Sequence, residues 1–294
     1  MQSGTQAGLD RAAVVGAGQM GNGIAHVFAT SGHAVTLIDV NADALAKGRD
    51  TIARNLDRQV KKGAIEASAA DAALARIATS TSLDAVADAA IIVEAATERT
   101  DLKFRIFEDL DRLAPAGAIL ASNTSSISIT EIAARTKRPE QVIGMHFMNP
   151  VPVMQLVEVI RGPLTLPDVA ERVDALARTM GKIVVHAQDS PGFIVNRVAR
   201  PYYAESLRLV GDGGVTPQDL DRLMESVGFR MGPFRLMDLI GVDTNLSVTT
   251  SVYEGLGRPP RFEPHPVQQN KVAQGHNGRK SGRGFYDYTP SNPA

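Results

Sequence analysis

The sequence of 294 residues contains no cysteine. This absence excludes thiol nucleophiles, disulfides and thiolate metal sites, and it is compatible with the reducing cytoplasm, where we expect the protein to act. No apolar run approaches the length of a membrane span, so no membrane partner is expected. The first nine residues lack the charged and apolar regions of a signal peptide, and we expect them to form a loose polar tail.

An excess of charge of either sign is also lacking. The 31 Lys and Arg residues balance 32 Asp and Glu residues, and the formal charge of −1 argues against nucleic acid as a partner. The histidines other than His146 have no partner at metal-ligand spacing, so we expect no metal site. The composition, with 44% hydrophobic and 21% charged residues, is that of a globular protein long enough for two domains.

A glycine-rich motif is present in its full context. An apolar run at residues 12–15 precedes Gly16-Ala-Gly-Gln-Met-Gly21, a helical pattern follows, and a second apolar run ends in Asp39, 18 positions after Gly21. A lone GxGxxG pattern is weak evidence, but a preceding strand, a following helix and a later acidic residue are the context that a dinucleotide-binding βαβ unit requires. The motif therefore predicts a dinucleotide site.

The residues of this unit indicate NAD as the cofactor. Gly16 permits the tight turn, Gly18 lets the backbone approach a pyrophosphate, and Gly21 lets the helix pack on the strand, with the helix N-terminus facing the anion. Asp39 would accept hydrogen bonds from the adenosine ribose and repel a 2′-phosphate. The next two residues offer no Arg, so NAD is favoured over NADP. The alternative interpretation of Asp39 is a turn residue at a strand end.

The alternation of strand and helix patterns continues after Asp39. We expect a helical arm at about 42–75, strands at 91–94, 119–121 and 183–185, helices around 102–110 and 168–180, and a strand–turn–strand segment over 142–160. This order predicts an α/β fold with a Rossmann-type doubly wound, mainly parallel sheet. From Gly192 the pattern is helical only, with helices near 192–210, after Thr216 and after Gly232. We therefore predict a Rossmann-type domain over 1–189 and an all-helical domain over 190–294.

His146 and Glu158 stand at the two ends of a segment interrupted by Pro150 and Pro152, which read as a rigid turn between two strands. If the two strands lie side by side, the imidazole can meet the carboxylate, which would orient it as a general base and stabilise its charged form. The alternative is an ordinary hairpin with a satisfied core histidine. For a lone histidine that alternative is favoured, so other residues must decide.

Two further polar residues occupy privileged places. Ser125 lies in Asn123-Thr-Ser-Ser126, directly after an expected strand, where an open parallel sheet presents its ligand crevice. Asn196 lies on the first helix of the second domain, where we expect it to face the cleft between the domains. Taken singly, Ser125 reads as a helix cap and Asn196 as a surface amide. Together with a dinucleotide site and an oriented histidine, they indicate a dehydrogenase.

These segments resemble the L-3-hydroxyacyl-CoA dehydrogenase family, and most closely its short bacterial 3-hydroxybutyryl-CoA dehydrogenases. The resemblance runs from Val14 to Tyr288 and includes the glycine motif, Val93-Glu-Ala-Ala-Thr-Glu98, Asn123-Thr-Ser-Ser126, His146-Phe-Met-Asn-Pro-Val-Pro152, Pro191-Gly-Phe-Ile-Val-Asn-Arg197, Met231-Gly-Pro-Phe234 and Gly278-Arg-Lys-Ser-Gly-Arg-Gly-Phe-Tyr286. It implies reversible, NAD-dependent oxidation of a 3-hydroxyacyl-CoA of short chain, a step of fatty-acid β-oxidation and related pathways. His146 matches the catalytic base, Glu158 its carboxylate partner, and Ser125 and Asn196 the groups that bind substrate oxygen.

The resemblance also assigns residues to the ligands. The cofactor pocket would include, besides the glycines and Asp39, Gln19, Met20, Glu98, Lys103, Asn123, Ser125, Asn149 and Lys280. Lys62 matches a Lys that contacts the CoA phosphates, and Asn55 stands where some relatives have Ser; a solvated Lys pair at a helix end is an equally good interpretation of Lys61-Lys62. The family forms two-fold dimers through the helical domain, for which residues 202, 203, 207 and 210 offer an apolar face.

Two other functions remain open at this point. A dehydrogenase of a sugar acid, such as L-gulonate, belongs to the same superfamily and uses no CoA. A dinucleotide-binding protein without turnover would keep the fold and lose the chemistry. The complete Asn123-Thr-Ser-Ser126 and His146-to-Glu158 pattern argues against the first. The presence of His146, Glu158, Ser125 and Asn196 argues against the second.

Overall fold

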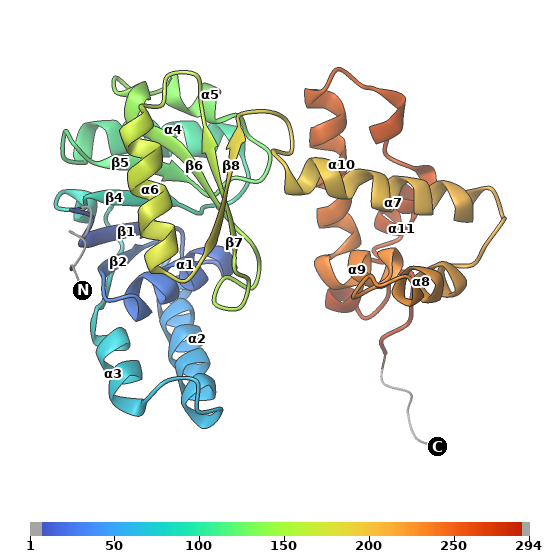
Figure 1. The fold of residues 1–294 in the computed structure, drawn as a ribbon, viewed down its shortest axis with the longest axis horizontal. Helices are drawn as coiled ribbons and strands as arrows, with labels where there is room; N and C mark the ends of the chain where they lie inside the picture. Colours follow the sequence, from blue (N-terminus) through green and yellow to red (C-terminus); the bar gives the residue numbers. More distant parts are fainter. Residues whose placement is uncertain (1–7, 290–294) are drawn as a thin grey trace. The chain divides into compact units, whose positions relative to one another are not determined.

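The computed structural model describes residues 8–289. The chain divides into two compact units, with the division between Ser190 and Pro191 (Figure 1). Residues 1–7 of the expected polar tail lie outside the described part. For Leu9 the expectation is wrong, because its side chain packs into the core of the first unit and its carbonyl oxygen lies 3.1 Å from Nδ1 of His33.

The first unit is built on an eight-stranded sheet with the strand order β3-β2-β1-β4-β5-β6-β7-β8. The strands are β1 (Arg11–Val15), β2 (Ala34–Ile38), β3 (Ile77–Ser80), β4 (Ile91–Glu94), β5 (Ile119–Ser122), β6 (Val142–Phe147), β7 (Leu156–Arg161) and β8 (Ile183–Gln188). Among these described strands, only β6 and β7 pair antiparallel; the other neighbours are parallel.

The parallel register brings the functional loops to one edge of the sheet. Val15 of β1 pairs with Glu94 of β4, and Glu94 pairs with Ser122 of β5, so these strands end side by side. β6 runs parallel to β5 and ends at the same edge. Four segments therefore leave the sheet at this edge: the glycine motif, residues 95–98, residues 123–126 and the β6–β7 turn. Open α/β sheets bind their ligands at this edge.

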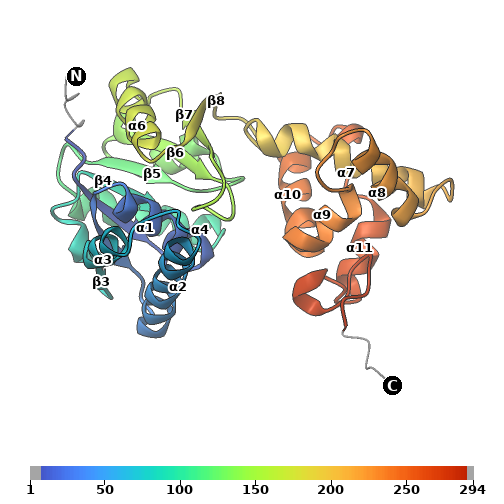
Figure 2. The same cartoon turned by 60° about the horizontal axis from the view of Figure 1, so that its bottom comes forward.

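Helices cover both faces of this sheet. They are α1 (Gln19–Thr30), α2 (Ala42–Lys61), α3 (Ala67–Ala75), α4 (Thr100–Leu113), α5 (Ile129–Ala133) and α6 (Pro167–Thr179), with short 3₁₀ turns η1 (Leu83–Val86) and η2 (Pro139–Gln141). The helices α1 and α6 lie on one face, and α4 and α5 on the other (Figure 1). The arm formed by α2 and α3 packs against α1 (Figure 2).

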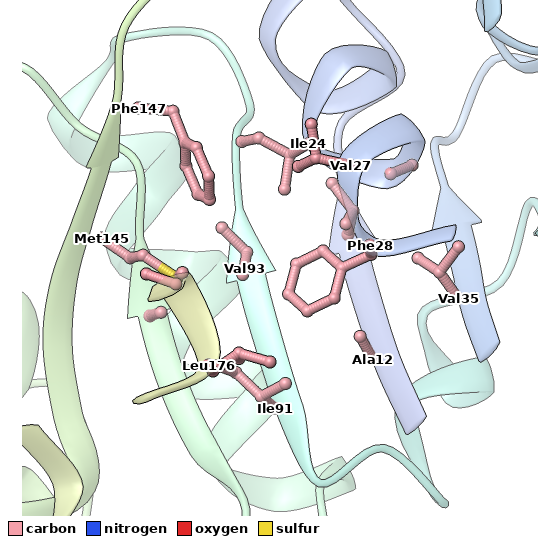
Figure 3. Packing of buried hydrophobic residues seen from close by; sticks show 14 of the residues in the cluster. Ala12, Ile24, Val27, Phe28, Val35, Ile91, Val93, Met145, Phe147 and Leu176 are labelled. Atoms are coloured by element: carbon pink, nitrogen blue, oxygen red, sulfur yellow. The ribbon is translucent and has the colours of Figure 1, made fainter. Parts of the chain in front are cut away.

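Apolar side chains from three elements close the core on the α1 face. Figure 3 shows Phe28 of α1 and Leu176 of α6 beside Ile91 and Val93 of the central strand β4. All four are almost completely buried. Because β4 is buried on both faces, it reads as an unbroken apolar run, as strands of parallel sheets do.

The predicted doubly wound sheet followed by a helical domain is confirmed, with local differences. The sequence did not predict β3, because only Ile77 of this edge strand is buried and no apolar run marks it. It did not predict α5 either, which has five residues and too few turns for a periodic pattern. Strand β8 extends three residues beyond Val185, to Gln188.

The second unit is helical and comprises α7 (Val195–Gly211), α8 (Pro217–Ser226), α9 (Pro233–Ile240), α10 (Val242–Gly255) and α11 (Pro266–Ala273), with 3₁₀ turns η3 (Pro260–Phe262) and η4 (Arg279–Ser281). As predicted, the Thr216 side chain caps α8 by accepting from the Asp219 N–H. The predicted start of α7 at Gly192 is wrong, since Gly192 and Phe193 have φ of 77° and 48°, outside the helical region. Within residues 8–289, none of the helices is long and apolar enough to cross a membrane.

The apolar face expected on α7 packs within its own unit. Tyr203 and Leu207 are buried against Leu220, Phe234 and Met237. Tyr203 and Leu207 therefore form part of the core of the helical unit. The expectation from the sequence that they form a surface for a second copy is wrong.

Candidate functional site

The glycine motif forms the turn between β1 and α1, and each glycine has its own reason. Gly16 has φ of +103°, and a Cβ added there would lie 2.7 Å from the Ala95 carbonyl oxygen. A Cβ on Gly21 would lie 1.7 Å from the Gly16 carbonyl oxygen, so the helix could not approach the strand. At Gly18 no described atom lies within 4 Å of the added Cβ, which leaves open space beside the backbone.

The start of α1 fits an anionic ligand. No side chain among the described residues caps this helix, whose N-cap is Gly18, so its first amide groups face outward without a side-chain acceptor. Gln19 is exposed and Met20 is partly buried against the core. Uncapped amides, the helix dipole and an open glycine together fit the pyrophosphate of a dinucleotide.

Asp39 directly follows β2, beside this turn. Its Oδ2 accepts from the Ala17 N–H at 2.8 Å, and its Oδ1 accepts from the Asn41 N–H at 3.0 Å. The carboxylate therefore orders the glycine turn as well as its own strand end. Each oxygen keeps a second lone pair, so the partly exposed side chain can still accept from ribose hydroxyls.

A pocket of about 480 Å³ lies next to the glycine turn, within the first unit. It is lined by the first turn of α1, one side of α2 and the β6–β7 turn, and it brings Gln19, Asn55 and Asn149 together. Lys62 follows Asn55 by seven residues, two helical turns or about 10 Å along α2, and lies exposed at the helix end. Its neighbour Lys61 is paired with Asp57 at 2.7 Å.

The strand–turn–strand segment places an imidazole on a carboxylate. His146 of β6 and Glu158 of β7 are direct partners in the antiparallel register, and Nδ1 of His146 lies 2.8 Å from Oε2 of Glu158. The two residues are 4% and 0% exposed. Direct cross-strand partners on one face of a sheet are close enough for side-chain contact, so the hairpin itself fixes this pair.

Ser125 adds a third residue to the His146–Glu158 pair. Its Oγ lies 3.0 Å from Nε2 of His146, on the side of the ring opposite Glu158. A neutral imidazole that donates from Nδ1 to Glu158 accepts at Nε2, so this arrangement selects one tautomer and leaves a basic nitrogen facing Ser125. Such a site can exchange a proton with a hydroxyl held near Ser125.

Glu98 holds the loop that carries Ser125. Its Oε1 accepts from the Thr124 hydroxyl, from the backbone N–H groups of Ser125 and Ser126, and from the Ser126 hydroxyl, at 2.5 to 3.2 Å. Burial alone would raise the pKa of Glu98, but the charge of Lys103 and these hydrogen bonds hold that pKa below its ordinary value. Glu98 is therefore ionised at neutral pH, and its charge keeps the loop ordered.

Two further predicted residues support the same edge. Lys103 is 1% exposed, with its ammonium 2.6 Å from Glu94 and 3.3 Å from Glu98, so it is an interior charge and not a surface one. Asn123 is buried and its Oδ1 accepts from the Phe147 N–H at 2.9 Å, which ties the loop after β5 to the end of β6. The structure thus brings Glu98, Lys103, Asn123 and Ser125 together with His146.

Asn196 and Lys280 belong to the second unit. Asn196 lies in the first turn of α7, is half-buried, and accepts at its backbone carbonyl oxygen from Nε of Arg200 at 3.1 Å. The Lys280 ammonium lies 2.7 Å from Asp243. Their expected roles toward substrate and cofactor remain predictions.

Sequence reasoning missed several residues of this network. Glu94 and Ser122 end neighbouring strands, and Lys182 donates to the carbonyl oxygens of Val151 and Met154, which fixes the β6–β7 turn. The sequence did contain a signal for Glu94, which is a charged residue at the end of an apolar run. Lys182 gave no local signal, because its partners lie about 30 residues away in the sequence.

Comparison with known proteins identifies the family. The family model for the NAD-binding domain of 3-hydroxyacyl-CoA dehydrogenase matches residues 11–190, and the model for the C-terminal domain of the same family matches residues 192–288. The chain is 46% identical over 276 residues to a probable 3-hydroxybutyryl-CoA dehydrogenase of Bacillus subtilis, covering 94% of this chain and 96% of that protein.

Two other similarities bear on substrate and fold. The chain is 45% identical over 277 residues to 3-hydroxyadipyl-CoA dehydrogenase of Escherichia coli; the match covers 94% of this chain but only 58% of that longer protein. The crystal structure of (S)-3-hydroxybutyryl-CoA dehydrogenase from Ralstonia eutropha is similar with a TM-score of 0.92 at 42% identity, covering 96% of this chain and 99% of that one. Sequence, domain order and three-dimensional structure agree, and the chain belongs to the 3-hydroxyacyl-CoA dehydrogenase family.

Proposed function

We propose that the protein catalyses the reversible, NAD-dependent oxidation of a short-chain L-3-hydroxyacyl-CoA, with 3-hydroxybutyryl-CoA as the best candidate, to the 3-ketoacyl-CoA. The observation that carries this proposal is the chain Ser125–His146–Glu158 at the sheet edge that also carries the glycine turn. Relatives named 3-hydroxybutyryl-CoA dehydrogenase support the substrate class. The similarity to a 3-hydroxyadipyl-CoA dehydrogenase supports an alternative substrate, in which the acyl group ends in a carboxylate.

NAD, when bound, supplies the acceptor for the hydride that leaves C3 of the substrate. Nε2 of His146 takes the proton of the 3-hydroxyl group, and Glu158 stabilises the imidazolium that results. Ser125 holds the substrate oxygen near Nε2, and Asn196 orients the thioester end. In the reverse direction the imidazolium returns the same proton to the ketone oxygen.

We assign the remaining ligand contacts by the resemblance to the family. The glycine turn with Gln19 and Met20 binds the pyrophosphate and Asp39 the adenosine ribose, as their geometry supports. Glu98, Lys103, Asn123, Asn149 and Lys280 serve the nicotinamide end. Asn55 in the pocket and Lys62 at the end of α2 contact the CoA portion, and the Lys62 ammonium pairs with the CoA phosphates.

A hydrolase with a Ser-His-Glu triad is disfavoured by the Ser125 loop. Acyl transfer needs N–H donors where an oxyanion develops near the nucleophile. The N–H groups of Ser125 and Ser126 both donate to Glu98, which places a negative charge at the position where such donors would be needed.

We further propose a homodimer formed through the helical unit. Large apolar side chains of that unit are exposed in the single chain, with Val198 71%, Val227 64% and Leu223 55% accessible. Burial of such groups against a symmetry-related copy is a common reason for dimer formation. Light scattering after size-exclusion chromatography should give a mass near 63 kDa, about twice the 31.3 kDa chain.

The activity is tested by NADH consumption with acetoacetyl-CoA. Parallel reactions with NADPH, with 3-oxoadipyl-CoA and with L-gulonate plus NAD separate cofactor, acyl group and the sugar-acid alternative. We expect NADH-dependent reduction of acetoacetyl-CoA. A folded protein that oxidises only L-gulonate, or that binds NADH without any turnover, would contradict the proposal.

A further inference from the structure

Glu94 is a buried carboxylate that the proposed mechanism leaves without a role. It is the last residue of β4, it is 0% exposed, and it pairs in the sheet with Val15 on one side and Ser122 on the other. A carboxylate removed from water is costly unless charged partners and hydrogen bonds compensate it. Its partners therefore indicate what this charge does.

Both carboxylate oxygens of Glu94 are used. Oε1 lies 2.6 Å from the ammonium of Lys103 and accepts from the Ala96 N–H at 2.7 Å. Oε2 accepts from the Ser122 hydroxyl at 2.7 Å. Because Lys103 is itself 1% exposed, this is an interior ion pair with little screening by solvent.

Two routes lead from Glu94 to the loop of Ser125. In the first, Lys103 contacts Glu98 at 3.3 Å, and Glu98 accepts from the Ser125 N–H. In the second, the Ser122 hydroxyl that donates to Glu94 also accepts from the Thr124 N–H at 3.2 Å, one residue before Ser125. Ser125 then contacts Nε2 of His146 at 3.0 Å.

We propose that Glu94 is a positioning residue for the reaction, which acts through Lys103 and Ser122 to hold the Ser125 hydroxyl against His146. This inference rests on the proposed function. The charges give the physical reason for this role. Glu94 binds the Lys103 ammonium, so Lys103 is shared between Glu94 and Glu98. Oε1 of Glu98 then remains available to accept hydrogen bonds from the Ser125 loop. With the charge of Glu94 removed, Lys103 attracts Glu98 more strongly, in competition with the hydrogen bonds to the loop.

The test is a double-mutant cycle between Glu94→Gln and Ser125→Ala in the full-length protein, with kcat for acetoacetyl-CoA reduction as the readout. Glutamine preserves the size and one acceptor but removes the charge. In the wild-type background Glu94→Gln should lower kcat about tenfold, and in the Ser125→Ala background less than about threefold, because the group it positions is gone. The KM for NADH should change less than kcat in both backgrounds.

Controls separate positioning from folding. Glu108→Gln removes an exposed carboxylate on α4, the helix that carries Lys103, and should leave kcat unchanged. If Glu94→Gln does not fold, as judged by circular dichroism, Ser122→Ala replaces it in the cycle and tests the second route alone, with an expected threefold loss that disappears beside Ser125→Ala.

The outcomes are distinct. Equal losses in both backgrounds, or no loss from Glu94→Gln in a folded protein, would overturn the positioning role and leave the proposed function intact. A wild-type protein that binds NADH but does not reduce acetoacetyl-CoA would overturn the proposed function and this inference with it.

Discussion

Nδ1 of His146 lies 2.8 Å from Oε2 of Glu158, and the two residues face each other across β6 and β7, the one antiparallel pair among the described strands of the sheet. The contact forms because β7 runs antiparallel to β6. After the β6–β7 turn the chain returns directly beside β6, and Glu158 therefore lies opposite His146. Glu158 is fully buried, so its charge acts on the imidazole with little screening.

Replacement of Glu158 by Gln should lower kcat by about 10²-fold or more, since the imidazolium formed during oxidation loses its counter-charge while the ring keeps a hydrogen-bond partner. Steady-state kinetics with acetoacetyl-CoA and NADH measure the effect. Glu171→Gln, at an exposed position on α6, is the matched control. Normal turnover of the Glu158 variant would mean that the pair is structural only.

Asp39→Ala should raise the KM for NADH about tenfold, because one charged acceptor for the ribose is lost together with the bond that orders Ala17. The preference for NADH over NADPH should fall in the same variant, as the repulsion of a 2′-phosphate disappears. Asp43→Asn, in the first turn of α2, serves as the control. An unchanged cofactor preference would show that Asp39 is only a turn residue.

Lys62→Met should raise the KM for acetoacetyl-CoA about fivefold without raising the KM for the N-acetylcysteamine thioester of acetoacetate, which lacks the CoA phosphates. Lys61 is the internal comparison, since it is already paired with Asp57. If Lys61→Met and Lys62→Met have equal and small effects on both thioesters, the pair is a solvated helix end and not a phosphate contact.

The stability of the first unit should depend on pH through His26. Burial, and then the charge of nearby Lys182, lower the pKa of His26 to about 4 from 6.5. Between these values the unfolded chain binds a proton that the folded chain does not, so the free energy of unfolding falls as the pH drops from 6.5 toward 4, by at most about 3 kcal/mol.

Urea unfolding at pH 7 and pH 5 measures this dependence. His26→Gln should reduce the difference between the two pH values, whereas His276→Gln in the helical unit should retain it. A pH dependence equal to that of the wild type in the His26 variant would assign the effect to other groups.

Sequence alone predicted what depends on neighbours along the chain. The glycine turn and Asp39 belong to one continuous βαβ unit, and Pro150 and Pro152 mark the turn that sets His146 beside Glu158. The position of Ser125 followed from the rule that parallel strands end at one edge. The structure confirms the fold class, and it shows Ser125, His146 and Glu158 in contact.

The remaining features depend on contacts between distant segments. Lys103 reads as one charge on an amphipathic helix, and only the packing of α4 against β4 shows that it is buried beside Glu94. The apolar residues of α7 read as a surface for a partner, but the packing of α8 and α9 makes Tyr203 and Leu207 part of a core. Strand β3 depends on its pairing with β2 and has little pattern of its own.

The most direct test of the central claim is the oxidation of NADH by the wild-type protein and by His146→Gln, followed at 340 nm with acetoacetyl-CoA as the substrate. The wild-type protein should consume NADH only when acetoacetyl-CoA is present, and the variant should bind NADH with unchanged affinity but show at least about 10³-fold lower kcat. Wild-type protein that binds NADH but leaves acetoacetyl-CoA unreduced, or a variant as active as the wild type, would contradict the account.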